Sequence, residues 1–165
     1  DVVHEHPDAD AGTVTGPWLS FKLYRRALIL VMGADGTVGQ GDITVTIHQA
    51  TDVSGTGDVL VNLLKTGRIY TKDHASDLIT NITQWTKRTQ ATADDEFTDA
   101  TSAEQQNLWA FEIEAKDLNV ADNFDCFNVA VNGNGGAAKL MAALCILYDA
   151  VYPDAPENMA SAQAN

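Results

Sequence analysis

Histidine side chains are the first candidates for chemistry in this chain, because they bind metals and transfer protons near neutral pH. His4 and His6 flank Glu5, a spacing that could hold a transition metal. Two imidazoles without a third fixed ligand hold a metal weakly, so we expect a solvated acidic segment there. His48 ends an alternating segment on its polar side and His74 lies in a polar turn, so we expect neither to be a ligand.

The carboxylates and glycines offer two further patterns. Asp122 and Asp125 could bind calcium in a loop, but the segment lacks the aspartate series and closing glutamate of an EF-hand. The glycines from Gly33 to Gly41 match a phosphate-binding loop only in number, since no Lys-Ser or Lys-Thr pair follows. Gly-x-Ser-x-Gly and His-Glu-x-x-His motifs are also missing. We therefore expect no catalytic residue, no metal site and no cofactor.

The two cysteines, Cys126 and Cys145, are too few for a disulfide scaffold or a zinc site. Both fall in apolar segments that we expect to be neighbouring strands. A disulfide forms if these strands pair in the matching register. Buried free thiols are the more common outcome in apolar surroundings, so the sequence favours them without deciding.

Composition excludes several classes of partner. The chain has 165 residues, of which 45% are hydrophobic, enough for one domain with an ordinary core. It has 23 acidic and 10 basic residues, a net charge of −13. This charge repels nucleic-acid phosphates and anionic lipid headgroups, so we expect no nucleic-acid and no membrane partner. No apolar run reaches the roughly 18–20 residues that cross a bilayer.

The basic residues are concentrated in the first half of the chain. From Gln90 onward, the only bases are Lys116 and Lys139, against many acids. Either this division gives the surface a basic and an acidic side that orient neighbouring subunits, or the clustering is accidental. On the first interpretation, the candidate contacts with a subunit or partner surface are Trp18, Arg25, Arg26, Arg68 and Lys72.

Period-two alternation predicts that β-strands position these residues. In residues 43–48, isoleucine and valine fall on one face and threonine and histidine on the other. Residues 108–114 alternate in the same way. The apolar run at residues 28–32 precedes a glycine-rich turn, which predicts a hairpin with residues 43–48. Residues 137–151 are apolar on both faces and follow an Asn-Gly turn, so we favour a long buried strand over a helix.

These elements predict an all-β, mainly antiparallel domain, a single β-sandwich or jelly-roll-like fold. We expect an N-terminal arm over residues 1–16, the sandwich over 17–152 and a C-terminal tail over 153–165. The predicted core is made of large apolar side chains on the strands: Leu28, Leu30, Val45, Ile47, Val61, Phe111, Ile113, Val129, Leu144 and Ile146.

Several segments also form a recognisable set. They are Ala-Gly-Thr-Val at 11–14, the strand at 44–52, the aromatic strand at 109–114, Phe-Asp-Cys-Phe-x-Val at 124–129, and Ile-Leu-Tyr-Asp-Ala-x-Tyr at 146–152. Together they resemble a family of small β-rich virion proteins of tailed phages, often encoded beside the major capsid protein. The similarity covers most of the chain except residues 65–106. None of the shared motifs is catalytic.

The resemblance implies a non-enzymatic capsid decoration, or cement, protein on the outer surface of the virion. Such a protein binds the lattice of the major capsid protein and stabilises the head. The resemblance further implies self-association, as a trimer at three-fold or quasi-three-fold positions. The five candidate contact residues would then lie at subunit or capsid contacts.

Other functions also fit the sequence. One is a different virion component, such as a tail-tube, neck or head-fibre subunit. Another is a secreted carbohydrate-binding β-sandwich, with Trp18, Trp85 and Trp109 as an aromatic platform. A third is an enzyme with a shallow acidic cleft.

Overall fold

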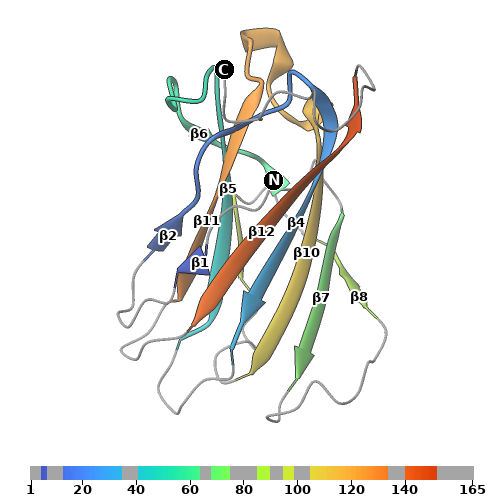
Figure 1. Cartoon of the computed structure of the whole chain (residues 1–165). Helices are drawn as coiled ribbons and strands as arrows, with labels where there is room; N and C mark the ends of the chain where they lie inside the picture. Colours follow the sequence, from blue (N-terminus) through green and yellow to red (C-terminus); the bar gives the residue numbers. More distant parts are fainter. Residues whose placement is uncertain are drawn as a thin grey trace.

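The computed structural model describes residues 5–6, 13–34, 41–63, 68–74, 85–89, 95–98, 105–133 and 140–151. Two antiparallel sheets pack against each other (Figure 1). The predicted all-β sandwich is therefore confirmed. In this part of the chain, no helix is long and apolar enough to cross a membrane.

The first sheet has long strands at its centre, and Figure 1 shows β12, β4, β10 and β7 side by side. Its order is β1-β12-β4-β10-β7-β8. The strands are β1 (Glu5–His6), β12 (Met141–Ala150), β4 (Tyr24–Gly33), β10 (Gln106–Glu114), β7 (Ile69–His74) and β8 (Thr86–Arg88).

The second sheet is built around β5 (Ile43–Ala50) and β11 (Cys126–Gly133), which pair over their full lengths. Shorter strands complete it on both sides. They are β2 (Thr13–Thr15) and β3 (Leu19–Ser20) beside β11, and β6 (Val59–Leu60) and β9 (Glu96–Thr98) beside β5.

The predicted hairpin of residues 28–32 with 43–48 is wrong. β4 pairs with β12 and β10 in the first sheet, whereas β5 pairs with β11, β6 and β9 in the second. The apolar faces of β4 and β5 meet across the core instead of lying side by side. Alternation alone does not distinguish these arrangements, because both bury the same face of each strand.

The segment that could be a helix or a strand is a strand. β12 pairs with β4 from Met141 to Tyr148 and again at Ala150. β12 and β11 lie in different sheets, although they are neighbours in sequence.

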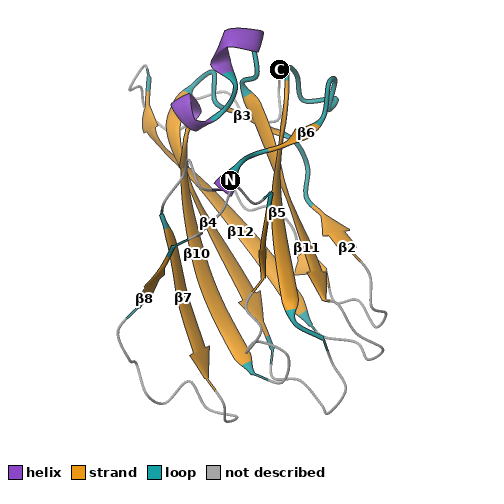
Figure 2. Cartoon of the chain, turned by 180° about the vertical axis from the view of Figure 1, so that it is seen from behind, coloured by secondary structure: helices purple, strands orange, loops and turns teal. Residues whose placement is uncertain are grey.

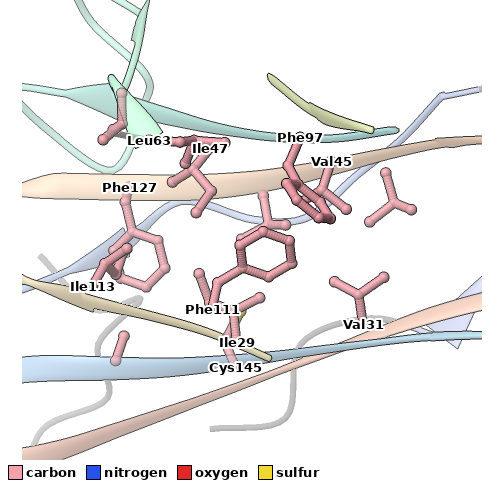
Figure 3. Close-up of a cluster of buried hydrophobic side chains, with 14 of the residues drawn as sticks. Ile29, Val31, Val45, Ile47, Leu63, Phe97, Phe111, Ile113, Phe127 and Cys145 are labelled. Carbon is pink, nitrogen blue, oxygen red and sulfur yellow. The ribbon is translucent and has the colours of Figure 1, made fainter. Parts of the chain in front are cut away.

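The core lies between the sheets and is rich in aromatic side chains. Phe97 of β9 meets Trp109 and Phe111 of β10 edge-to-face, with ring centroids 5.1 and 5.6 Å apart. Phe127 stacks on Phe21 at 4.8 Å. Figure 3 shows the two sheets contributing to one cluster, with Ile29, Val31, Phe111, Ile113 and Cys145 from the first sheet and Val45, Ile47 and Phe127 from the second.

Six of the ten predicted core residues are buried: Val45, Ile47, Val61, Phe111, Ile113 and Val129. The other four, Leu28, Leu30, Leu144 and Ile146, were predicted wrongly. Their neighbours Ile29, Val31 and Cys145 point inward, so these four side chains lie on the outer face of the first sheet. β4 and β12 are apolar on both faces, and a strand of that kind carries no signal for which face points inward.

Two short 3₁₀ helices connect β10 to β11, and Figure 2 shows both at one end of the sandwich. They are η1 (Ala115–Asp117) and η2 (Val120–Asp122). Asp117 is buried, and its carboxylate accepts a hydrogen bond of 2.8 Å from the backbone amide of Glu114. η2 ends at Asn123, which adopts the left-handed conformation with φ 64°.

Candidate interaction surface

The outer face of the first sheet is aliphatic at its centre. Three adjacent strands contribute to it in register: Leu30 of β4 lies between Ala110 of β10 and Leu144 of β12, and Met32 lies between Leu108 and Ala142. We call this surface the apolar face, made of Leu28, Leu30, Met32, Leu108, Ala110, Ala142, Leu144 and Ile146.

Solvent reaches this surface in the described structure. Met32 is 44% exposed and Ile146 is 39% exposed. Leu28, Leu30 and Leu144 are half-buried, because neighbouring side chains on a flat sheet partly cover one another. The apolar face is thus an extended hydrophobic surface, not a set of scattered residues.

An aromatic and basic margin borders the apolar face on the β7 side. Tyr70 pairs with Ala110 and Lys72 with Leu108. The Lys72 ammonium lies 5.4 Å from the ring centroid of Trp85, within cation–π range. Lys72, one of the predicted contact residues, therefore lies beside the apolar face.

Arg68 is held by carboxylates of its own chain. Its Nη2 donates to the carboxylate of buried Asp117, and its Nε donates to the backbone oxygen of Glu112 at 3.2 Å. Its Nη1 lies 3.7 Å from Glu114. The structure gives Arg68 a structural role between β7, β10 and η1, with few donors left for a partner.

Glu114 lies at the centre of this charged group. The hydrogen bond from Lys116 contributes most to lowering the pKa of Glu114, and the charges of Arg68 and Arg26 lower it further. Burial and the hydrogen bond that Tyr148 donates to Glu112 raise the pKa of Tyr148. These groups therefore keep fixed protonation states around neutral pH and stabilise one end of the first sheet.

Arg25 and Arg26 are more loosely paired than Arg68. Arg26 lies 3.6 Å from Glu112 and Glu114 and 3.8 Å from Asp149, and Arg25 lies 3.6 Å from Asp149. A hydrogen bond with Tyr148 raises the pKa of Arg26. Arg26 lies on the same side of β4 as Leu28 and so borders the apolar face at this end of the sheet.

Trp18 and Trp109 pack against other residues of the same chain. A Cβ added at Gly55 would lie 2.6 Å from Nε1 of Trp18, and Gly55 has φ +80°, so the indole packs closely against this glycine. Trp109 is fully buried in the core. Trp18 and Trp109 therefore do not join Trp85 in an exposed aromatic platform.

The outer face of the second sheet is polar. Thr44 and Thr98 form a hydrogen bond of 2.7 Å between their hydroxyl groups. Thr46 lies opposite Ala130 on one side and Glu96 on the other. Thr44 and Asn128 on this face are buried and Thr46 is half-buried, so the face is polar but largely covered.

Three side chains at that face, Thr46, His48 and Asp58, are arranged in the order of a hydrolytic triad. The sequence analysis did not predict this arrangement. His48 Nδ1 lies 2.7 Å from Asp58 Oδ1, and its Nε2 lies 3.4 Å from Thr46 Oγ1. The Thr-x-His spacing on one strand face was the available signal. The hydroxyl-to-imidazole distance exceeds the roughly 2.6–3.2 Å of an activated nucleophile. The pair therefore links β5 to the segment before β6, and no catalysis follows from it.

Both cysteines are free and buried, and they lie on strands of different sheets. Burial raises the pKa of Cys126 to about 12, with a contribution from the hydrogen bond to Asp125, and raises the pKa of Cys145 to about 12.

Asp122, a candidate calcium ligand, accepts a hydrogen bond from Asn119. Among the residues that the structure describes, no three His, Cys, Asp or Glu side chains are grouped to hold a metal.

His4 and residues 153–165 fall outside the described residues, and the side chain of His6 does too.

Comparison of the chain with models of known families, with curated proteins and with solved structures finds no match.

Proposed function

We propose that this protein is a non-enzymatic structural component of a phage virion, a capsid decoration protein that binds the lattice of the major capsid protein. The apolar face of the first sheet carries the proposal, because it provides a surface for a partner. The resemblance to tailed-phage virion proteins supports the choice of partner. The net charge of −13 is acceptable on the outside of a head, away from the packaged DNA.

An aliphatic outer face is unfavourable in water. β4 and β12 have the composition of strands that are covered on both sides. Burying apolar area contributes ~25 cal/mol per Å², so covering the apolar face with a third layer stabilises the assembly. The polar face of the second sheet has no such requirement, so the binding surface is assigned to one side of the molecule.

The size of the apolar face favours a partner that offers many identical binding positions. Three strands ~4.8 Å apart, over about five residues at ~3.3 Å each, give a footprint on the order of 250 Å². A stable pairwise interface buries about 800 Å² per partner. A single contact is therefore weak, whereas a lattice that engages several linked copies gains affinity through multivalency. A trimer, which the resemblance implies, would present three such faces.

Co-sedimentation with heads assembled without this protein tests the proposal. Wild-type protein should saturate the heads at a fixed ratio of copies to capsid subunits. Met32→Asp and Ile146→Asp place a charge on exposed positions of the apolar face, so the fold should tolerate them. Each should weaken binding at least tenfold.

Thr15→Asp is the matched control, since it adds the same charge to an exposed position on the outer face of the second sheet. It should bind like wild type. Failure of the wild-type protein to bind heads would refute the decoration function. Binding that survives Met32→Asp and Ile146→Asp would refute the apolar face as the contact surface.

A further inference from the structure

A hollow of about 280 Å³ lies at the end of the first sheet where β4 begins and β12 ends. Figure 1 shows these two strand ends together. Its lining residues come from β4, β12 and the junction of β10 with η1: Arg25, Arg26, Glu114, Ala115, Lys116 and Asp149. It adjoins the apolar face through Arg26, which lies on the same side of β4 as Leu28.

The lining of the hollow has an excess of basic residues, whereas the whole chain has an excess of acidic residues. Three of its lining residues are basic and two are acidic, whereas the chain has 23 acidic and 10 basic residues. The side chains of Arg25 and Lys116 are 60% and 74% exposed. A basic hollow on an acidic protein attracts carboxylates from solution.

The internal pair of Arg25 leaves its guanidinium donors open to a ligand, whereas Arg26 is shared among three carboxylates and a hydrogen bond with Tyr148. Both arginines meet carboxylates at 3.6–3.8 Å, beyond the roughly 2.7–3.2 Å of a good hydrogen bond. Arg68, by contrast, donates directly to Asp117 and to the backbone of Glu112. Arg25, with its long contact to the exposed Asp149, therefore keeps donors for a ligand at the hollow.

Asp149 separates the two arginines. Its Oδ1 faces Arg25 and its Oδ2 faces Arg26. The residue adopts φ +59°, a left-handed conformation uncommon for a side chain other than glycine. The adjoining backbone is fixed by the bond from the Val151 amide to the Leu23 oxygen, at 2.9 Å. Both guanidinium groups thus contact the one carboxylate of Asp149, at 3.6 and 3.8 Å.

We propose that this hollow is a carboxylate-binding site that receives an acidic side chain of a second copy of the chain. Arginine binds carboxylates with two parallel hydrogen bonds, and Lys116 supplies further donors. A second copy is the occupant because the chain carries 23 acidic residues, and a base of one copy that meets an acid of the next offsets the repulsion between copies with a net charge of −13. The inference is independent of capsid binding.

Analytical ultracentrifugation of the full chain tests the site. The variant Arg25→Gln/Lys116→Gln removes two charges from the hollow, and Lys22→Gln/Lys87→Gln removes two exposed charges elsewhere. Both variants have the same net charge. Wild type and control should self-associate equally at 50 mM salt, and the hollow variant should be at least tenfold weaker. High salt should weaken the wild-type contact.

Hexaglutamate serves as the free ligand. Calorimetry should show that it binds wild type and the control but loses at least tenfold in affinity for the hollow variant, and it should dissociate the wild-type oligomer. Equal losses of affinity for hexaglutamate in both variants would show that only the overall charge matters, and would overturn the site. Binding of hexaglutamate by a wild-type protein that stays monomeric would overturn the second copy as occupant.

Discussion

The outer faces of the two sheets differ in polarity, because β4 and β12 are apolar on both faces whereas β5 alternates apolar and polar residues. The face of the first sheet presents Leu30, Leu144 and their aliphatic neighbours, while that of the second presents Thr44, Thr46 and His48. On the second sheet Thr44 is buried and Thr46 and His48 are half-buried, so the two faces differ in polarity and not in contact with water. The first sheet exposes part of its aliphatic outer face, at Met32 and Ile146, which is why we propose the partner contact there.

The same contrast holds within the charged end of the first sheet. Arg68 has a tight pairing with buried Asp117, and Arg25 has a long contact with exposed Asp149. The tight pair maintains the fold, and the loose pair leaves donors for a ligand. Burial and distance thus separate structural arginines from candidates for binding.

The largest effect should come from the core that both sheets share. Phe111→Ala should destabilise the protein by about 3–5 kcal/mol, because Phe111 is fully buried and its removal leaves a cavity. Leu30→Ala, on the apolar face, should cost about 1 kcal/mol or less, since a partly solvated side chain leaves no closed cavity. Urea denaturation measures both, and equal losses would contradict the assignment of the two faces.

Arg68→Ala should come next. It removes the basic partner of the buried Asp117 carboxylate, which keeps the hydrogen bond from the Glu114 amide, at a cost of about 2–4 kcal/mol. Arg25→Ala should change stability by about 0.5 kcal/mol or less, because its ion pair is exposed. Thermal unfolding of both variants checks the contrast, and a large loss for Arg25→Ala would show that it too is structural.

Acid should weaken the charged end of the first sheet. The pKa of Glu114 lies below its usual value of 4.5, so the folded state favours the charged carboxylate. The resulting stability is fully present above pH 4.5 and is lost as the pH falls through the lowered pKa. Lys116→Gln should reduce this loss, because the Lys116 hydrogen bond contributes most to the shift. Denaturation midpoints from pH 3 to 7 measure it, with Lys87→Gln as the control.

The smallest effect concerns the thiols. With pKa values of about 12, Cys126 and Cys145 stay protonated and should not react with a thiol reagent at pH 8. Both should react once the protein is unfolded in guanidinium chloride. Rapid reaction in the native state would show that one of the two strands opens in solution.

Alternation in the sequence was enough to predict β5 and β10 and which of their faces is buried. Val45 and Ile47 alternate with polar residues on β5, so one face had to be buried. β4 and β12 are apolar on both faces, so their sequences do not show which face is buried. Leu28 and Leu144 were therefore wrongly predicted to lie in the core. The candidate surface was predicted only in part, because Lys72 and Arg26 border it while its aliphatic centre was assigned to the interior.

The sequence by itself determined an acidic all-β domain with a hydrophobic core, because charge, composition and period-two patterning act locally. Only the tertiary structure decided which face of β4 points inward, that β4 and β5 belong to different sheets, and that Arg25, Lys116 and Asp149 share one hollow. These features depend on strand pairing between distant segments. Period-two patterning records which residues share a face, but not which strand lies beside it or what covers it.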